Sequence, residues 1–87
     1  MYMTKNNSTI AFFVNIPRFE GNKYIMGFTR AVYYPMELIR ERVSMAYNVL
    51  PEKVHILKPD GTEVNYEKTI GENDISPMME LNAKFKK

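Results

Sequence analysis

The sequence predicts a single α+β domain in which one helix lies across one face of a mixed sheet. Two observations predict it. Segments with alternating apolar side chains flank one segment in which apolar side chains recur at helical spacing. These segments follow the order β-β-α-β-β-β, so the helix comes after a hairpin. A chain of 87 residues has room for one modest core. The helix covers one sheet face, and the other face is left open to water or to a partner.

The first two strands are predicted to form a hairpin. Residues 9–16, TIAFFVNI, are rich in β-branched and aromatic side chains and alternate between an inward and an outward phase. Residues 23–33 read as a second strand, and the short link at residues 17–22 predicts antiparallel pairing. Gly27 interrupts the second strand, so we expect a bulge or a bend at this position.

The helix is predicted to begin at Pro35, where a missing N–H group costs nothing. Met36, Ile39 and Val43 recur at helical spacing and form the face that is directed to the core. Asn48 suits the C-terminal end of the helix. The sequence therefore predicts one amphipathic helix between the hairpin and the remaining strands.

The third strand follows a proline corner. Val54 and Ile56 are predicted to face inward, and His55 and Leu57 outward. The turn Pro59-Asp60-Gly61 follows, because proline sets one backbone angle and glycine supplies a positive φ. Residues 63–66 are then expected to pair back as a short fourth strand.

An irregular connection leads to the last strand. In TIGENDIS, residues 69–76, Ile70 and Ile75 are the side chains expected to plug the core. Residues 78–85 alternate again and form the predicted last strand. Of the seven methionines, Met26, Met36 and Met79 suit core filling, whereas Met45 and Met78 are expected to be exposed.

These features together resemble the ubiquitin-like β-grasp family over residues 9–85. The apolar helix positions, the Leu50-Pro51 break and the third strand resemble the family's helix, proline corner and third strand without a gap. PDGTEV resembles the turn into its short fourth strand. Thr69, Ile70 and Ile75 in TIGENDI resemble the residues that plug its core before the last strand. The resemblance implies the β-grasp fold.

The predicted domain organisation is a flexible segment at residues 1–8, a ubiquitin-like domain at residues 9–85 and a basic tail at residues 86–87. Conjugated members of the family end in a slim Gly-Gly tail that enters an activating enzyme. The sequence given ends Lys84-Phe85-Lys86-Lys87. The resemblance therefore implies a non-conjugating module that acts by docking to protein partners.

The resemblance also implies a docking face on the outer side of the third and last strands. Leu57 occupies the place of the family's central apolar residue, and His55, Asn82 and Lys84 are the flanking outward positions. We add Phe13, which lies on the outward phase of the first strand. Either a partner covers Phe13 or this strand is buried on both faces, and self-association by strand addition at an open edge is a further possibility.

Two alternatives remain open at this level. Doublecortin-type β-grasp domains also have a helix, a third strand that ends in an Asp-Gly turn, and basic residues, and they bind an acidic filament surface, the microtubule. A small nucleic-acid binder is the other alternative, although a net charge of +2 is too small to favour it. Both readings depend on the lysines near the predicted outer face, which are Lys53, Lys58, Lys84, Lys86 and Lys87.

The composition contains few of the residues that catalytic sites commonly use. The chain has no cysteine and one histidine, so thiolate metal sites and cysteine nucleophiles are excluded. His55 reads as an exposed strand residue, since no second acid-base group or nucleophile stands in a recognisable pattern with it. We therefore expect a non-enzymatic protein without a cofactor or metal. No apolar run approaches the roughly 18 residues of a membrane span. We also expect a cytoplasmic location.

Overall fold

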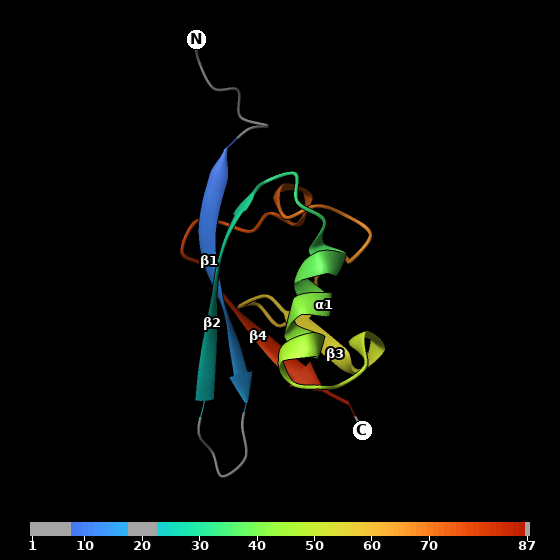
Figure 1. The fold of residues 1–87 in the computed structure, drawn as a ribbon. Helices are drawn as coiled ribbons and strands as arrows, with labels where there is room; N and C mark the ends of the chain where they lie inside the picture. The colour runs from blue at the N-terminus through green and yellow to red at the C-terminus, as the bar shows by residue number, and fades with distance from the viewer. Residues whose placement is uncertain (1–7, 18–22, 87) are drawn as a thin grey trace.

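The computed structural model describes residues 8–17 and 23–86. The predicted flexible segment lies outside this range except for Ser8, and so does Lys87 of the predicted tail. Figure 1 shows the elements, which are β1 (Thr9–Pro17), β2 (Lys23–Ala31), α1 (Met36–Ala46), the short 3-10 helix η3 (Pro51–Lys53), β3 (Val54–Leu57), a second 3-10 helix η4 (Gly71–Asn73) and β4 (Glu80–Phe85).

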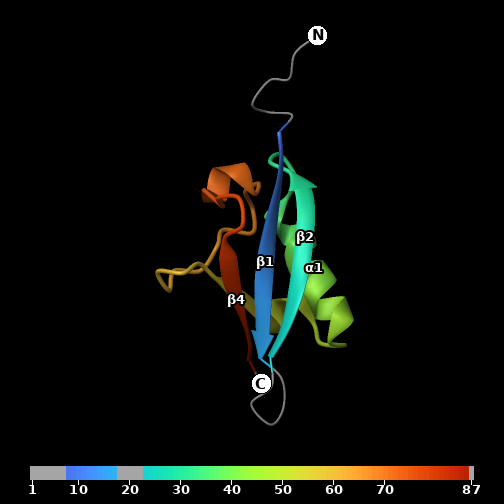
Figure 2. The same cartoon turned by 90° about the vertical axis from the view of Figure 1, so that its left-hand side faces the viewer.

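The four strands form one mixed sheet in the order β2-β1-β4-β3. β1 pairs with β2 in antiparallel and with β4 in parallel orientation, and β3 pairs with β4 in antiparallel orientation. α1 packs across one face of this sheet, and its residues Met36, Ile39 and Val43 are fully buried. The predicted α+β architecture is confirmed. On the side of the sheet that is turned away from α1, which faces the viewer in Figure 2, no described helix covers the strands.

The core contains the inward side chains of every strand and both predicted plugs. Phe12 of β1 stacks on Phe28 of β2, with the ring centroids 5.4 Å apart. Ile70 and Ile75 are buried, as the sequence predicts. Their buried side chains fix the long connection between β3 and β4, which has little regular structure, to the rest of the core.

The helix termini follow from two residues. Pro35 precedes α1 in an extended conformation, and the Met36 N–H group donates to the carbonyl of Lys68 at 3.0 Å, which satisfies one of the free donors of the first turn. Asn48 adopts a positive φ of 56°, a left-handed conformation that asparagine tolerates. Both boundaries agree with the sequence prediction to within a residue or two.

The fourth strand of the predicted order is reduced to one bridge, between Leu57 and Glu63. Beside this bridge the Val64 N–H group still donates to the Ile56 carbonyl at 3.0 Å, but side chains bond to the next backbone groups. The Ile56 N–H group donates to the Tyr66 hydroxyl at 2.8 Å, and the Asn65 N–H group donates to Oδ1 of Asn73 at 2.7 Å. The prediction of a strand at residues 63–66 is therefore wrong, and the described order is β-β-α-β-β.

Of the two alternatives predicted for Gly27, a bulge or a bend, the bulge is wrong. The β1–β2 register is continuous from Thr9–Ala31 to Pro17–Lys23, and it places Gly27 directly opposite Phe13. A Cβ atom at Gly27 would lie 3.7 Å from the Phe13 ring. The glycine therefore leaves the surface beside the ring open, and the ring packs over the strand backbone.

Candidate docking face

The sheet face that α1 leaves uncovered carries one residue from each strand in a single row. Strand register places Ile25 of β2 beside Asn15 of β1, Asn15 beside Asn82 of β4, and Asn82 beside Leu57 of β3. We call these four residues the central row. They point away from the core, because side chains on alternate strand positions face opposite sides of a sheet. Ile25 is 56% exposed, although it is a large apolar side chain.

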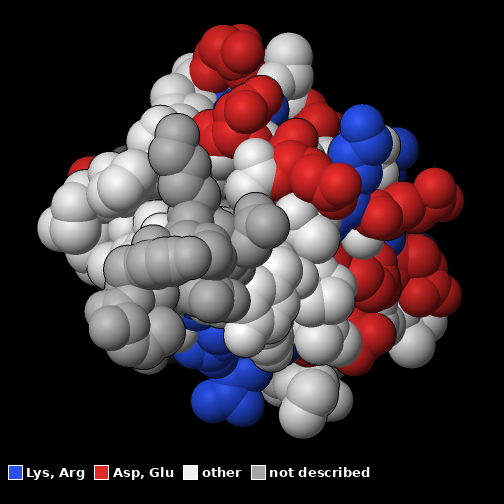
Figure 3. Space-filling model, turned by 90° about the horizontal axis from the view of Figure 1, so that it is seen from above, with Lys and Arg blue, Asp and Glu red and all other residues white. Residues whose placement is uncertain are grey.

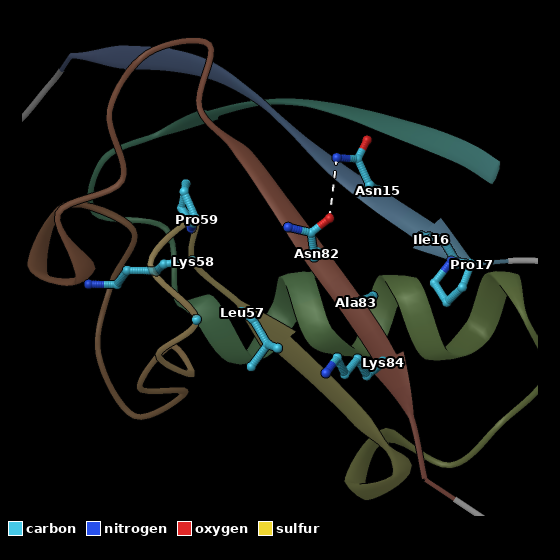
Figure 4. Close-up of a pocket in the computed structure, with 10 residues that line it drawn as sticks. Asn15, Ile16, Pro17, Leu57, Lys58, Pro59, Asn82, Ala83 and Lys84 are labelled. Atoms are coloured by element: carbon cyan, nitrogen blue, oxygen red, sulfur yellow. Dashed lines mark hydrogen bonds between the residues drawn. The ribbon is translucent and has the colours of Figure 1, made fainter.

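A groove of about 360 Å³ runs along the β1, β4 and β3 side of this row. Figure 4 shows Leu57 and Asn82 pointing into it from neighbouring strands, with Lys84 on the same face of β4. The groove is mostly apolar in character but has amide and ammonium groups at its border. Its lining includes Asn15, Leu57, Lys58, Pro59, Asn82 and Lys84.

The two asparagines of the central row are positioned by hydrogen bonds. The Asn15 side-chain amide donates to Oδ1 of Asn82 at 3.4 Å and to Oε1 of Glu80 at 3.2 Å. Glu80 and Asn82 are successive outward residues of β4, so the Asn15 amide bridges two neighbouring side chains on the outer face of that strand. Within the described residues these bonds do not use the side-chain nitrogen of Asn82 or the side-chain oxygen of Asn15. Both atoms are therefore available to a donor or acceptor of a partner.

His55 is not the exposed histidine that the sequence predicts. Its side chain is 24% exposed, and Nδ1 lies 2.9 Å from Oε2 of Glu63. Nε2 is buried, and no described residue hydrogen-bonds to it. Register places His55 beside Lys84. The ring therefore supports this end of the outer face, while neither of its nitrogens is directed to solvent.

His55 belongs to a polar cluster that closes the outer edge of β3. We call Arg40, His55, Glu63 and Tyr66 the β3-edge clasp. The Tyr66 hydroxyl donates to Oε2 of Glu63 at 2.6 Å while it accepts the Ile56 N–H group. The Arg40 guanidinium lies 4.0 Å from the centre of the Tyr66 ring, and its Nε donates to the carbonyl of Val54 at 3.1 Å. The clasp thus provides side-chain hydrogen-bond partners for the Ile56 N–H group and the Val54 carbonyl at the edge of β3.

The clasp shifts two ionisation equilibria. Burial alone would raise the pKa of the Glu63 carboxyl, but the hydrogen bonds from Tyr66 and His55 outweigh it and hold this pKa below its ordinary value of 4.5. Burial, followed by the hydrogen bond to Glu63, raises the pKa of the Tyr66 hydroxyl above its ordinary value of 10.0. At neutral pH the clasp therefore holds an ionised Glu63 and a neutral Tyr66.

Phe13 lies on the predicted outer face but outside the groove. It is half-buried, because its ring packs over Gly27 and the residue itself stands beside Glu80 of β4. The sequence left two explanations for this outward phenylalanine, a partner or burial on both faces. The ring's contact with Gly27 accounts for part of its burial within the chain.

Charge on the molecule is unevenly distributed. Figure 3, seen from above, shows acidic side chains gathered over one side of the molecule with a few basic ones among them. The uncovered sheet face is different, since Lys58 and Lys84 border the groove and Glu80 is the acidic residue paired with β1 there. The described groove is therefore weakly basic, and Lys53 and Lys86 follow Lys84 at the same end of β3 and β4, where the Lys86 N–H group donates to the Lys53 carbonyl.

Other kinds of site find little support in the described part of the chain. It contains no group of three or more histidine, cysteine or acidic residues placed to hold a metal ion. Within the same residues no helix has the length and apolar character that a membrane crossing requires. A second, more open hollow of about 530 Å³ lies beside the β3-edge clasp, lined by Glu37, Arg40 and Glu63 among others.

The structure brings four of the five predicted site residues together. Leu57 and Asn82 are neighbours in the central row, His55 and Lys84 are neighbours one step further along, and Phe13 lies apart. Sequence reasoning missed Asn15 and Ile25. Both occupy the outward phase of their strands, which the alternation reveals, but only the strand register shows that they share a row with Leu57.

Comparison with solved structures decides the fold. The chain is similar to ubiquitin from Caldiarchaeum subterraneum, with a TM-score of 0.71 and 10% identity over 88% of this chain and 95% of that one. It is also similar to a de novo design based on ubiquitin, with a TM-score of 0.63 and 21% identity over 87% and 89% of the two chains. This chain has the ubiquitin-like β-grasp fold.

A further ubiquitin-like match comes from a crystal structure of a pParkin–pUb–UbcH7 complex. The TM-score is 0.70 and the identity 19%, over 90% of this chain and 23% of the matched chain. No protein-family model and no curated protein matches the sequence. With identities this low, the likeness establishes the ubiquitin-like β-grasp fold alone.

Proposed function

We propose that this chain is a non-catalytic ubiquitin-like interaction module, which binds a protein partner non-covalently through the central row and its groove. One observation carries the proposal. A β-grasp sheet that needs one face for its core presents, on its other face, a groove with an apolar side chain, Leu57, beside Asn82. Concave, mostly apolar sites with a few oriented polar groups are typical binding sites.

The chemistry of the groove favours a partner segment that is apolar in the middle and acidic at its flanks. Leu57 and Pro59 offer apolar contact, and Lys58 and Lys84 offer ammonium groups at the border. The amides of Asn15 and Asn82 can hydrogen-bond to the backbone of a segment laid along the groove. Such a segment gains apolar burial in the groove and charge complementarity at its rim.

The arrangement of His55 favours docking over catalysis. General acid-base chemistry needs a nitrogen within hydrogen-bond reach of the substrate. Nδ1 of His55 is engaged with Glu63, and Nε2 is buried. In the proposed module the histidine supports the outer face and exchanges no proton with a substrate.

A second candidate is a module that binds an acidic filament surface or nucleic acid through lysines. Lys58 and Lys84 at the groove favour it. Glu80 on the same sheet face, and the weakly basic character of the groove, weigh against a broad electrostatic footprint. We therefore rank it below the docking module.

Salt and two substitutions separate the candidates. Partner capture from an extract of the source organism should weaken about tenfold or more in Leu57→Ala if an apolar anchor carries binding. Capture should change little as the salt concentration rises, whereas lysine contacts to phosphate or acidic tails weaken steeply. Met45→Ala, an exposed helix position, is the matched control. If Lys84→Glu abolishes capture while Leu57→Ala leaves it unchanged, the second candidate is the correct one.

A further inference from the structure

The two edges of the sheet differ. β3 ends the sheet on one side, and the β3-edge clasp and the following turn occupy its outward groups. The Val54 carbonyl accepts from Arg40, the Ile56 N–H group donates to Tyr66, and the Ile56 carbonyl accepts from Val64 at 3.0 Å. β2 ends the sheet on the other side, and no described strand pairs with its outer edge.

Hydrogen bonds of the neighbouring strands show which backbone groups of β2 face outward. The Phe13 N–H group donates to the carbonyl of Met79, on the β4 side, at 2.9 Å. Gly27, which stands opposite Phe13, is therefore in a non-hydrogen-bonded pair, and its N–H and C=O groups point away from β1. The Val32 N–H group donates to the Ser8 carbonyl, which places the even-numbered residues in the hydrogen-bonded pairs. The odd-numbered residues of β2 thus present their backbone groups at the edge.

This edge lacks the usual protections against pairing. Native edges are commonly blunted by charged side chains, proline or a bulge. Residues 24–29 of β2, YIMGFT, contain no charge and no proline, and the register with β1 is continuous. Tyr24 and Ile25 are 47% and 56% exposed. Within the described part of the chain, no residue hydrogen-bonds to the outward groups of Ile25 and Gly27.

We propose that the outer edge of β2 pairs with β2 of a second copy of this chain, antiparallel and two-fold symmetric, with Gly27 opposite Gly27 of the second copy. Odd residues must pair with odd ones, because only they present backbone groups outward. The Gly27-centred register meets this condition and also overlaps the whole strand, Lys23–Ala31, with itself. The result is one continuous sheet across the two copies.

The side chains are complementary in this register. On the outer face Ile25 stands opposite Thr29 of the second copy, and on the inner face Tyr24 stands opposite Arg30 of the second copy. Within one copy the Arg30 guanidinium already lies 5.5 Å from the Phe28 ring centre and 5.3 Å from that of Tyr34. The Tyr24 ring of the second copy would therefore offer the Arg30 guanidinium a third aromatic ring for a cation–π contact. No like charges oppose each other from residue 24 to residue 30.

One contact within the chain touches the proposed interface. Nη1 of Arg30 donates to the Thr29 carbonyl at 2.9 Å, at an exposed position. A carbonyl oxygen has two lone pairs and can accept a second bond from the Ile25 N–H group of the other copy. The contact is therefore compatible with pairing.

Charge-swapped variants test the edge and its register together. Ile25→Lys/Thr29→Lys places lysine opposite lysine twice in the dimer, and Ile25→Glu/Thr29→Glu does the same with carboxylates. Both side chains are exposed in the single copy, so folding, checked by circular dichroism, should be unaffected. Sedimentation equilibrium should give twice the chain mass of 10.2 kDa for the wild type at high concentration. Each variant alone should dimerise about tenfold or more weakly.

An equimolar mixture of the lysine and glutamate variants should dimerise again, because opposite charges then face each other. Met45→Lys/Met78→Lys adds the same charge at two exposed positions away from β2 and should dimerise as the wild type does. Amide exchange gives a second readout, in which Ile25, Gly27 and Thr29 gain protection with concentration. A wild type that stays at single-chain mass up to millimolar concentration, or variants that dimerise normally, would overturn the proposal. Because Ile25 belongs to the central row, these variants are read for self-association alone, and partner capture is tested separately with Leu57→Ala, which leaves β2 unchanged.

Discussion

Tyr66→Phe removes a single hydroxyl group from the β3-edge clasp and keeps the aromatic ring. The hydroxyl makes two hydrogen bonds, one from the buried Ile56 N–H group at 2.8 Å and one to the Glu63 carboxylate at 2.6 Å. The ring would keep its place under the Arg40 guanidinium, 4.0 Å from its centre. The substitution therefore isolates the hydrogen bonds that stand in for the missing fourth strand.

The magnitude follows from those two bonds. A buried backbone N–H group left without a partner costs about 1–3 kcal/mol, and a hydrogen bond to a charged group contributes about 1.5–3 kcal/mol. Solvent can re-satisfy part of this at a half-buried tyrosine, so we expect the free energy of unfolding to fall by about 2–3 kcal/mol. For a domain of this size the midpoint of thermal unfolding falls by about 10–20 °C. Urea denaturation followed by circular dichroism measures the difference.

The difference in unfolding free energy between wild type and Tyr66→Phe should also depend on pH. The pKa of Tyr66 is raised in the folded chain above its ordinary value of 10.0, so the hydroxyl's contribution is complete below this value. It is lost as the pH rises through the folded pKa. The stability gap between wild type and Tyr66→Phe should be constant near neutral pH and shrink above about pH 10. Tyr33→Phe, at an exposed position, is the control and should change stability by less than about 0.5 kcal/mol. A gap below about 0.5 kcal/mol, or one that stays constant at alkaline pH, would refute the role given to the hydroxyl.

Two further predictions concern the clasp and the core. The pKa of Glu63 is lowered, so its contribution to stability is present above the ordinary pKa of 4.5 and is lost as the pH falls through the folded pKa. The difference in unfolding free energy between wild type and Glu63→Gln, measured by urea denaturation, should therefore narrow on acidification. A difference that stays the same at every pH would contradict this. Ile70 is fully buried, so Ile70→Ala should lower the free energy of unfolding by about 2–5 kcal/mol. The matched exposed control, Met45→Ala, should stay within about 0.5 kcal/mol, and a similar loss in both would show that Ile70 does not fix the long connection.

Strong, local signals made most of the fold predictable. Alternation identified the inward residues of β1, β3 and β4, and Pro35 and Asn48 marked the ends of α1 to within a residue or two. These signals depend on residues that are close in the chain, so the sequence displays them directly. Ile70 and Ile75 were predicted as core residues of an irregular connection, a prediction that the resemblance to the ubiquitin-like family supported, and both are buried.

The errors concern specific contacts between residues of different segments. Gly27 reads as a bulge or a bend, and the bulge is excluded only when the register places it opposite Phe13, where the two pack together. Residues 63–66 read as a strand, but the Tyr66 hydroxyl takes the Ile56 N–H group that such a strand would have used. His55 reads as exposed because the expected return of residues 63–66 to the third strand does not by itself reveal the contact between the Glu63 carboxylate and the imidazole ring. In each case a specific contact with another segment overrode a local preference.

The candidate face was predictable in part for the same reason. Leu57, Asn82, His55 and Lys84 lie on adjacent paired strands, and the resemblance to the ubiquitin-like family was enough to group them. The other half of the central row depends on a parallel pairing between the first and last strands, which no local pattern displays.

Site-specific photo-crosslinking tests the central claim, that the central row and its groove bind a protein. A photoreactive amino acid replaces Asn82, which is exposed in the central row, or Met45, which is 71% exposed on the helix side. In an extract of the source organism, the account predicts that the probe at Asn82 crosslinks to a discrete protein. The same band should be absent with the probe at Met45 and at least about tenfold weaker when Leu57→Ala is added. Equal crosslinking from both positions, or a band from Asn82 that Leu57→Ala leaves unchanged, would contradict the claim.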